Sequence, residues 1–384
     1  MTARSITILG ATGSIGASTL DLIRREKGHW RIVALTANGN AAELVRLARE
    51  FSPEIAVLAD ESGLPELREG LAGTGIEIAV GARALVEAAS RAADLTIAAI
   101  VGCAGLAPTM AAIEQGGTIG LANKEALVSA GEVMMAAVRA NGATLLPVDS
   151  EHNAIFQCLA GNRQSEVHKI TLTASGGPFR EWSTAQLAAA TPGQAVKHPN
   201  WDMGAKISID SATMMNKGLE LIEAFHLFPV GLDRLAIIVH PQSVVHSMVE
   251  YRDGSTLAQL GPSDMRVPIA SALAWPLRMD TPCERLDLAA IGKLTFEAPD
   301  EERFPATKLA RQAAEAGGAI PAVLNAANEI AVAAFLSGQI GFTSITAHVD
   351  VLSCYAPPKP ASLADVFAID AEARQRARLL TETA

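Results

Sequence analysis

The sequence predicts an α/β protein with three parts: an N-terminal Rossmann-like, doubly wound parallel sheet, a central α+β domain with a mobile lid loop, and a C-terminal bundle of α-helices. Three observations predict this class. Short β-rich runs alternate with helical patterns over residues 1–149, the alternation weakens over 150–275, and only helical patterns follow residue 306. The predicted domains are therefore 1–149, 150–275 and 306–384, with a linker over 276–305.

The N-terminal domain is predicted from β-rich runs, several of which are continuously apolar. Strands of this composition are buried on both faces, as in a parallel sheet that helices cover. Their alternation with helical patterns is typical of βαβ units, so a doubly wound sheet is the simplest arrangement. The expected strands span residues 5–9, 31–35, 55–58, 95–100, 118–122 and 143–148.

The central domain has fewer and less regular signals. Its expected elements are strands over residues 169–174, 235–239 and 243–251 and a helix over 211–227. Residues 188–206 contain two prolines and two glycines and little periodicity, which predicts a long loop. Because loops of this length are usually functional or disordered, this segment is expected to be a lid.

The C-terminal part follows Trp275-Pro276 and a linker rich in proline and charge. Ser362 and Asp365 have the spacing of a capping box, with Asp in place of the usual Glu or Gln, and they support a helix start at this position. The expected helices span residues 306–316, 321–336, 343–354 and 362–380.

The composition indicates a globular protein and excludes several classes. The chain is 49% hydrophobic and 19% charged, and it contains no run of about 18 apolar residues that could span a bilayer. A net charge of −10 argues against a nucleic-acid-binding surface over the whole chain. Four cysteines without C-x-x-C spacing predict neither a disulfide framework nor a zinc site, and the absence of a targeting segment predicts a cytoplasmic protein.

A glycine-rich turn follows the first expected strand. Gly10, Gly13 and Gly16 precede a helical run, where backbone N–H groups and the helix dipole can hold a pyrophosphate. The same spacing fits a plain βα turn, but its position at the start of an alternating chain favours dinucleotide binding. An NAD site would place an acid at the end of the second strand, which here ends Ala34-Leu35-Thr36, so NADPH is favoured.

Two acids follow the last expected strand of the N-terminal domain. Asp149 and Glu151 are two residues apart, so in an extended segment their side chains leave on the same side. Glu220 would complete a set of three carboxylates, which suits a hard cation such as Mg²⁺ or Mn²⁺. The alternative is that Asp149 and Glu151 are solvated charges at a strand exit.

Two segments indicate a phosphorylated ligand. Ser175-Gly176-Gly177 ends an expected strand in a turn whose hydroxyl and N–H groups can hold a phosphate, although a plain turn fits as well. His198 lies in the expected lid, and its charge change near neutral pH suits a phosphate or hydroxyl contact.

The expected helix 211–227 carries a polar face. Ser211 is a good N-cap, and positions 213, 216, 217 and 220 share one face that presents Asn, Lys and Glu. A solvated polar stripe is the alternative. Gly218 argues against it, because Gly inside a helix costs about 1 kcal/mol relative to Ala and indicates that another group approaches closely.

Nine sequence blocks occur together and in order along the chain. They are Gly13-Ser14-Ile15-Gly16, Leu121-Ala122-Asn123-Lys124-Glu125, Val148-Asp149-Ser150-Glu151-His152, Ala174-Ser175-Gly176-Gly177-Pro178-Phe179, Lys197-His198-Pro199-Asn200-Trp201, Asn216-Lys217-Gly218-Leu219-Glu220, His240-Pro241-Gln242-Ser243, Asp264-Met265-Arg266-Val267-Pro268 and Leu324-Asn325-Ala326-Ala327-Asn328-Glu329. By these blocks the chain resembles the 1-deoxy-D-xylulose 5-phosphate reductoisomerase family over almost its whole length.

The resemblance implies a homodimeric enzyme of the methylerythritol phosphate route to isoprenoids. Such an enzyme uses NADPH and Mg²⁺ or Mn²⁺ to convert 1-deoxy-D-xylulose 5-phosphate, a phosphorylated ketose, into 2-C-methyl-D-erythritol 4-phosphate. The metal would act as a Lewis acid and template for rearrangement of the carbon skeleton, and the aldehyde formed would be reduced by NADPH. A retro-aldol/aldol path and a single α-ketol migration both remain open.

The resemblance also assigns residues by motif position. The metal would be bound by Asp149, Glu151 and Glu220. Glu151 is a candidate proton acceptor, Lys124 a candidate electrostatic partner, and His198 would close over the substrate under a lid that includes Trp201 and Met203. The substrate would contact Lys124, Ser150, Glu151, Ser175, His198, Ser211, Asn216, Lys217 and Glu220. The cofactor would contact Thr12, Gly13, Ser14, Ile15, Asn38, Gly39, Asn40, Asn123, Glu125 and Gly204.

One position departs from the family, and two other functions compete. The family often has a basic residue at the position of Gly39, so the contact with the 2′-phosphate is in question. A semialdehyde-type dehydrogenase would use Cys103 or Cys158 as nucleophile and would be sensitive to alkylation but not to chelation. A non-catalytic NADPH sensor would use the Rossmann domain alone and would not need three carboxylates.

Overall fold

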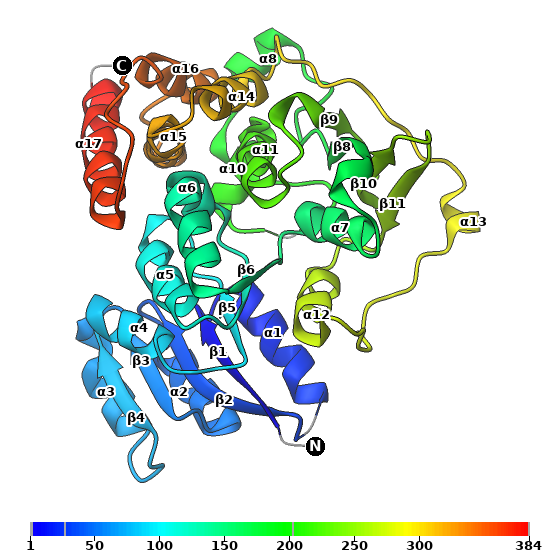
Figure 1. The fold of residues 1–384 in the computed structure, drawn as a ribbon. Coiled ribbons are helices and arrows are strands. Elements are labelled where there is room, and N and C mark those ends of the chain that lie inside the picture. Colours follow the sequence, from blue (N-terminus) through cyan, green and yellow to red (C-terminus); the bar gives the residue numbers. More distant parts are fainter. Residues whose placement is uncertain (1–2, 27, 202, 383–384) are drawn as a thin grey trace. The chain divides into compact units, whose positions relative to one another are not determined.

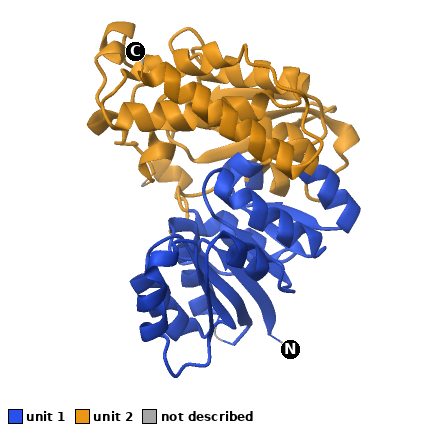
Figure 2. Ribbon diagram, turned by 90° about the vertical axis from the view of Figure 1, so that its left-hand side faces the viewer, with its two compact units in different colours: residues 1–126, 134–153, 265–283 blue, residues 127–133, 154–264, 284–384 orange. Residues whose placement is uncertain are grey.

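The computed structural model describes residues 3–26, 28–201 and 203–382 and contains two compact units (Figures 1 and 2). Unit 1 comprises Met1–Ala126, Met134–Asn153 and Met265–Cys283, and unit 2 comprises Leu127–Val133, Ala154–Asp264 and Glu284–Ala384. This grouping places residues 265–283 with the N-terminal sheet, and it places the C-terminal helices in the same unit as the central sheet. The predicted separation of 150–275 from 306–384 as folding domains stays a prediction.

Unit 1 is built on a seven-stranded sheet in the order β4-β3-β2-β1-β5-β6-β7. Every pairing in it is parallel, which confirms the doubly wound class. The edge strand β4 was not predicted, because its residues are only partly buried and lack a long apolar run. The strands are β1 Arg4–Leu9, β2 Trp30–Ala37, β3 Ile55–Leu58, β4 Glu77–Val80, β5 Leu95–Ala98, β6 Thr118–Leu121 and β7 Thr144–Pro147.

Helices connect these strands, and local sequence fixes their ends. In α2, the Asn40 side chain caps the first turn by accepting from Glu43 N, and Ser52 ends the helix in the left-handed region. Helix α12 packs beside α1, where Arg266 Nη1 lies 3.2 Å from Asp21 Oδ2. The helices are α1 Ser14–Arg25, α2 Ala41–Phe51, α3 Leu64–Gly70, α4 Ala82–Ala89, α5 Leu106–Glu114, α6 Lys124–Asn141 and α12 Arg266–Ala274, with short 3₁₀ turns η1 Glu61–Gly63 and η2 Cys103–Gly105.

The strand order reverses between β1 and β5, and the glycine turn lies at this switch point. Gly10 has a φ of 90°, and a Cβ atom there would lie 2.8 Å from the Ala99 carbonyl oxygen. A Cβ atom at Gly16 would lie 2.4 Å from the Gly10 oxygen. Both positions therefore require glycine, one for conformation and one for close packing of α1 on the turn.

Unit 2 contains a mixed four-stranded sheet in the order β11-β10-β8-β9. Strand β10 pairs antiparallel with β8 and β11, and β8 pairs parallel with β9, which confirms the α+β prediction. The edge strand β11 was not predicted, because it is short and mostly exposed. The strands are β8 Val167–Ala174, β9 Leu235–Val239, β10 Val245–Tyr251 and β11 Thr256–Leu260.

The C-terminal helices follow the predicted pattern. Helix α17 begins as the capping box predicts, since Asp365 N donates to Ser362 Oγ (3.2 Å) and Ser362 N donates to Asp365 Oδ2 (3.0 Å). In the predicted linker only a short helix, α13 Leu288–Ile291, is added. The four helices are α14 Ala306–Ala316, α15 Ile320–Leu336, α16 Phe342–Leu352 and α17 Leu363–Glu382. Each helix of the described residues is too short or too polar to cross a bilayer.

The predicted helix over 211–227 is wrong in its start. Two helices, α10 Ala205–Ala212 and α11 Met215–Leu227, meet at Met214, which has a φ of 64°. Ser211 therefore ends α10 and does not cap α11. The break is stabilised by Thr213, whose hydroxyl donates to Ile209 O (3.1 Å) and accepts from Met215 N (3.3 Å). A left-handed methionine has no signature in the sequence.

The predicted loop 188–206 is only partly irregular. It includes one turn, α9 Pro192–Ala195, at whose start Gln194 Oε1 accepts from the N–H and the hydroxyl of Thr191 (both 2.9 Å), and its last residues start α10. Residues 196–201, 203 and 204 belong to no helix or strand, and Asp202 lies outside the described residues. The remaining helices of this half of the chain are α7 Ser150–Leu159 and α8 Thr184–Ala188, with 3₁₀ turns η3 Gln164–Glu166 and η4 Leu232–Arg234.

Candidate active site

The glycine turn of unit 1 has the features of a pyrophosphate site. Thr12, Gly13, Ser14 and Ile15 are exposed or half-buried at the carboxyl edge of the sheet. Helix α1 has Gly13 at its N-cap with no side chain accepting there, so the N–H groups of its first turn face the turn without a side-chain cap. A phosphate group fits this position, because it would accept from those N–H groups at the positive end of the helix.

The second predicted cofactor segment lies at the end of β2. Asn38, Gly39 and Asn40 are all exposed, and Asn40 also caps α2. Asp60, in the loop after β3, is a residue that sequence reasoning missed. It lies beside Gly39, where a Cβ atom would be 3.5 Å from Asp60 Oδ2. The signal was available, because strands 55–58 and 31–35 were both predicted parallel and their carboxyl ends share one sheet edge.

Helix α6 begins with three residues of one predicted block. Asn123 is its N-cap, with Oδ1 accepting from Ala126 N (3.1 Å) and Nδ2 donating to Gly102 O (2.9 Å). Asn123 and Glu125 are buried, and Asn123 packs so tightly that a Cβ atom at Gly105 would lie 2.3 Å from its Nδ2. Asn123 thus fixes the turn that precedes Lys124 by ordinary capping.

Lys124 and Asp149 form a buried ion pair in unit 1. Lys124 Nζ lies 2.5 Å from Asp149 Oδ2, and the two side chains are 7% and 10% exposed. In so dry a setting each charge stabilises the other strongly. The candidate electrostatic partner, Lys124, is therefore paired with a candidate metal ligand, Asp149.

The expectation that Asp149 and Glu151 belong to one extended segment is wrong. Helix α7 begins at Ser150, so Glu151 lies in the first helical turn. Asp149 instead acts as a helix start, with Oδ1 accepting from Glu151 N (3.2 Å) and its carbonyl accepting from Asn153 N (2.9 Å). Ser150 Oγ donates to Glu151 Oε2 at 2.6 Å, so these two predicted substrate contacts are already joined.

His152 is a further member of this cluster that sequence reasoning quoted in a motif but gave no role. It is fully buried, and its Nδ1 lies 3.2 Å from Asp149 Oδ1. Residues that orient a metal-ligating carboxylate hold it in this way. A single histidine between Glu151 and Asn153 carries no sequence signal of such a contact.

Ser175 and His198 are brought together in unit 2. Ser175 Oγ lies 2.9 Å from His198 Nε2 and accepts from Gly177 N at 3.1 Å. On the other side of the imidazole ring, Nδ1 accepts from the backbone N–H groups of Asn200 (3.2 Å) and Trp201 (3.0 Å). Because Nδ1 accepts twice, the proton of the neutral ring is on Nε2, where it donates to Ser175.

Burial lowers the pKa of His198 to about 4, below the ordinary 6.5. The unfolded chain therefore takes up this proton before the native one, so the native state loses stability as pH falls from 6.5 towards 4. We expect His198→Gln to reduce this loss, measured as the urea midpoint on both sides of that pH window. The exposed His168→Gln is the control, and an equal effect of both variants would contradict the prediction.

Asn216, Lys217 and Glu220 lie together on α11, as predicted. Asn216 Nδ2 donates to Glu220 Oε1, and Lys217 Nζ donates to Glu220 Oε2. Lys217 and Glu220 are 4% and 1% exposed, so the face is not a solvated stripe. The close approach predicted from Gly218 is confirmed, and its cause is packing: a Cβ atom there would lie 2.7 Å from Ala310 Cβ of α14.

Ser211 lies beside the Ser-Gly-Gly turn, on the other side of the break at Met214. Gly177 has a φ of 69°, and a Cβ atom there would lie 2.6 Å from the Ser211 carbonyl oxygen. The turn that holds Ser175 and the end of α10 that holds Ser211 are therefore in direct backbone contact. Glycine is required at position 177 both for its φ and for this approach.

A buried polar chain that sequence reasoning missed supports α10. Asp210, 1% exposed, accepts from Asn328 Nδ2 (2.8 Å) and pairs with Lys206 Nζ (2.7 Å). Gly204, a predicted cofactor contact, is the N-cap of the same helix. The contact between Asp210 and Asn328 joins α10 to α15 across more than a hundred residues of sequence, which no local pattern indicates.

The geometry disfavours a thiol nucleophile. Burial raises the pKa of Cys158 to about 11, so its thiol stays protonated at neutral pH. Cys103 is also buried, in the 3₁₀ turn after β5. Neither position resembles the electropositive, accessible setting of a reactive cysteine.

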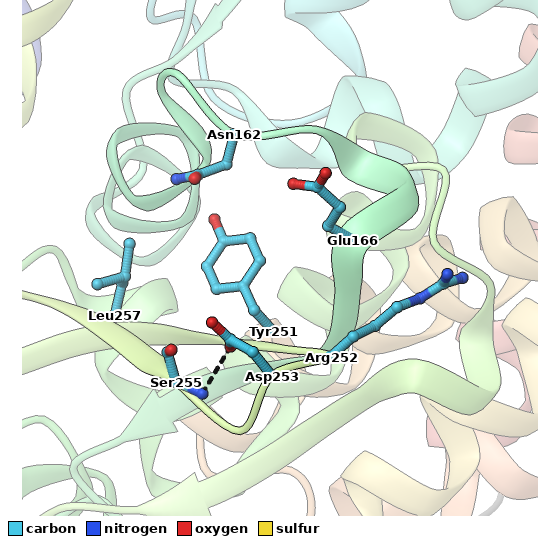
Figure 3. Close-up of a pocket in the computed structure, with 7 residues that line it drawn as sticks. All are labelled: Asn162, Glu166, Tyr251, Arg252, Asp253, Ser255 and Leu257. Atoms are coloured by element: carbon cyan, nitrogen blue, oxygen red, sulfur yellow. Dashed lines mark hydrogen bonds between the residues drawn. The ribbon is translucent and has the colours of Figure 1, made fainter.

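A cavity of ≈ 320 Å³ in unit 2 lies apart from the predicted residues (Figure 3). Tyr251 is one of its lining residues, and its hydroxyl donates to Cys158 O at 2.8 Å. Its lining shares no residue with the predicted site and comes from the β10–β11 hairpin and the segment before β8. The lining residues are Asn162, Glu166, Tyr251, Arg252, Asp253, Ser255 and Leu257.

Comparisons with known proteins identify one family throughout the chain. The family model described as 1-deoxy-D-xylulose 5-phosphate reductoisomerase matches residues 6–131. Two models of C-terminal domains of the same reductoisomerase match residues 145–228 and 260–376.

Individual relatives agree with the family models. The reductoisomerase of Zymomonas mobilis is 60% identical over 381 residues, which cover 99% of this chain and 98% of the relative, and that of Caulobacter vibrioides is 58% identical over 346 residues, or 90% and 87%. A solved structure of the Zymomonas mobilis enzyme in complex with NADPH has a TM-score of 0.95 at 58% identity, with 100% of both chains covered. Another reductoisomerase structure, with NADPH, fosmidomycin and magnesium, has a TM-score of 0.94 at 44% identity, covering 99% and 98%. The chain therefore belongs to the 1-deoxy-D-xylulose 5-phosphate reductoisomerase family.

Proposed function

We propose that this chain converts 1-deoxy-D-xylulose 5-phosphate into 2-C-methyl-D-erythritol 4-phosphate, with NADPH and a divalent metal ion, in the methylerythritol phosphate route of isoprenoid biosynthesis. The observation that carries the proposal is the 60% identity to a reductoisomerase over 99% of the chain. Relatives solved with NADPH and with magnesium support the cofactors. The chain is then an NADP-dependent oxidoreductase whose substrate is a small phosphorylated ketose.

Asp149, Glu151 and Glu220 are the proposed ligands of Mg²⁺ or Mn²⁺. Their oxygen-only donor set fits a hard cation, and His152 and Lys217 hold the ligands Asp149 and Glu220 in place. When bound, the ion would polarise the ketone and a neighbouring hydroxyl of the substrate.

Lys124 and Glu151 are proposed to act on the reacting carbons. Lys124, held 2.5 Å from Asp149 Oδ2, supplies a fixed positive charge near the carbon atoms that rearrange. Glu151 Oε2 accepts a hydrogen bond from Ser150 Oγ at 2.6 Å. Its carboxylate is therefore placed to accept a proton through that hydroxyl or directly from the substrate.

Ser175, Ser211, Asn216, Lys217 and His198 are proposed to hold the substrate phosphate. The Ser175 turn and the end of α10 already touch, and the N–H of a neutral His198 ring points at Ser175. A phosphate would take over this N–H and the Lys217 ammonium as charge-assisted donors. Closure of the predicted lid, residues 188–206 with Trp201 and Met203, over the ligand and the nicotinamide would exclude water during hydride transfer.

The glycine turn and the loop after β2 are proposed to bind NADPH, together with Asn123 and Glu125 after β6 and Gly204. The uncapped start of α1 would bind the pyrophosphate. The exposed loop of Asn38, Gly39 and Asn40 lies where the adenosine ribose binds in dinucleotide folds.

One assay tests the proposed function. NADPH oxidation should follow addition of 1-deoxy-D-xylulose 5-phosphate only when Mg²⁺ or Mn²⁺ is present, and chelation should abolish it. Oxidation that survives chelation but is lost on thiol alkylation would support the cysteine dehydrogenase instead. NADPH binding without any oxidation, at saturating substrate and metal, would support the sensor.

We further propose that the protein is a homodimer that associates through β11. This strand is one of the two edges of the four-stranded sheet. Its first three residues are exposed, and its sequence Thr-Leu-Ala-Gln-Leu contains neither charge nor proline. Such an edge is open to pairing with a second strand.

Leu257→Lys should therefore shift the sedimenting species from dimer to monomer, because it adds a charge to the proposed pairing edge, where Leu257 is 44% exposed. Leu288→Lys changes a leucine that is 57% exposed in α13 and is the matched control. Dimers of unchanged stability in both variants would contradict the role of β11.

A cytoplasmic location is also proposed. Cys158 and Cys354 are both free thiols, and Cys354 is exposed, which suits a reducing compartment. Labelling of Cys354 in intact and lysed cells would test this location.

A further inference from the structure

The loop after β3 carries a carboxylate to the loop after β2. Ala59 N donates to Ala37 O and Asp60 N donates to Asn38 O, each at 2.9 Å, so the two loops run together past the ends of their strands. A Cβ atom at Gly39 would lie 3.5 Å from Asp60 Oδ2 and 3.7 Å from Asp60 Cβ. The carboxylate therefore stands beside the Gly39 backbone.

This carboxylate is charged at neutral pH and is held in place. Asp60 caps η1, with Oδ1 accepting from Ser62 N at 2.9 Å. The hydroxyl and the backbone N–H of Ser62 hold the pKa of Asp60 below its usual range. Among the described residues no lysine or arginine forms an ion pair with Asp60, so its charge acts on its surroundings without a paired cation.

The position of Asp60 matters because of what binds at this sheet edge. In dinucleotide folds the adenosine ribose lies at the end of the second strand, where an acid accepts from a 2′-hydroxyl and a cation binds a 2′-phosphate. The sequence alone suggested that nothing here repels a 2′-phosphate. The structure places an anion from the neighbouring strand there, and Gly39 supplies no cation to offset it.

We propose that Asp60 is a specificity-determining residue of the cofactor site, which weakens the binding of the 2′-phosphate of NADPH and accepts a hydrogen bond from the 2′-hydroxyl of NADH. The inference rests on the proposed function, since it takes NADPH as the cofactor. It predicts that the ratio of the affinities for NADPH and NADH is smaller than would be expected from the lack of an acid at the end of β2 alone.

Asp60→Asn tests this directly, because the amide oxygen can still accept from Ser62 N and cap η1. Dissociation constants of NADPH and NADH, measured by nicotinamide fluorescence without substrate or metal, should change in opposite directions. We expect NADPH to bind about threefold to tenfold tighter and NADH somewhat more weakly, with the gain for NADPH reduced at high salt.

Glu61→Gln is the matched control. Glu61 is the next residue in the chain and carries the same charge, but its Oε1 lies 2.8 Å from the Cβ position of Gly81, not beside Gly39. Competition by 2′,5′-ADP and by 5′-AMP isolates the contribution of the 2′-phosphate, and only the affinity for 2′,5′-ADP should rise in Asp60→Asn.

Gly39→Arg should increase the affinity for NADPH more in the Asp60→Asn background than alone, because Asp60 would otherwise pair with the new guanidinium.

The outcomes separate this inference from the proposed function. A parent that binds NADPH, with Asp60→Asn and Glu61→Gln changing its affinity equally or not at all, would overturn the role of Asp60 alone. A parent that binds neither cofactor would overturn the proposed function and this inference with it.

Discussion

Asp149→Asn and Glu220→Gln are each expected to lower kcat by about 100-fold or more, because each keeps the shape of the side chain but removes one charge from an oxygen site for a hard cation. Excess Mn²⁺ should restore part of the activity by mass action. The affinity for NADPH should change little, since these acids are not among the residues proposed to bind it. Metal titrations of kcat, with NADPH binding measured in parallel, give the readout.

Two features of the structure sharpen this test. Asp149→Asn also breaks the ion pair with Lys124, and Glu220→Gln breaks the pair with Lys217. Because the lost ion pairs differ, rescue by metal in both variants points to the ion. Glu250→Gln is the control, because this half-exposed carboxylate on β10 pairs with Lys169. Near-parental turnover of Asp149→Asn and Glu220→Gln in chelator-treated buffer would mean that the metal-centred mechanism must be withdrawn.

Lys217→Met should reduce kcat/KM by about 10-fold to 100-fold, since a charge-assisted hydrogen bond contributes about 1.5–3 kcal/mol. Methionine fills the buried volume without the charge. The loss in kcat/KM should be greater for 1-deoxy-D-xylulose 5-phosphate than for 1-deoxy-D-xylulose, because the substituted lysine is proposed to bind the phosphate. Steady-state kinetics with both substrates measure this difference.

The control for Lys217 is Lys169→Met, which removes a half-exposed lysine paired with Glu250. Kinetics close to those of the parent are expected for it. If Lys217→Met lost NADPH binding while its substrate kinetics were unchanged, α11 would have been assigned to the wrong part of the site.

Much of the fold could be predicted because it depends on local patterns. The strands of the first sheet, apart from β4, are apolar runs, and the last helices have regular periodicity and, at Ser362, a recognisable cap. The two strands that were missed share one cause. Strands β4 and β11 lie at sheet edges, where exposed residues replace the apolar pattern.

The candidate site was predictable where one segment carries the residues and not where distant segments meet. Asn216, Lys217 and Glu220 were grouped correctly because one helix turn joins them. Met214 was missed because its left-handed backbone is imposed by the surroundings. The contact of Asp210 with Asn328 depends on pairing between distant segments, which a single sequence does not reveal.

The packing of Gly218 against α14 has a consequence for how the chain is made. The helix that bears Asn216 and Lys217 completes its apolar surroundings only against Ala306 and Ala310, residues synthesised some ninety positions later. During translation, α11 therefore leaves the ribosome well before its packing partner exists. A chain that stalls before residue 306 would lack the helix that packs against Gly218, so this apolar face of α11 would be exposed and the chain would be a substrate for chaperones or proteases.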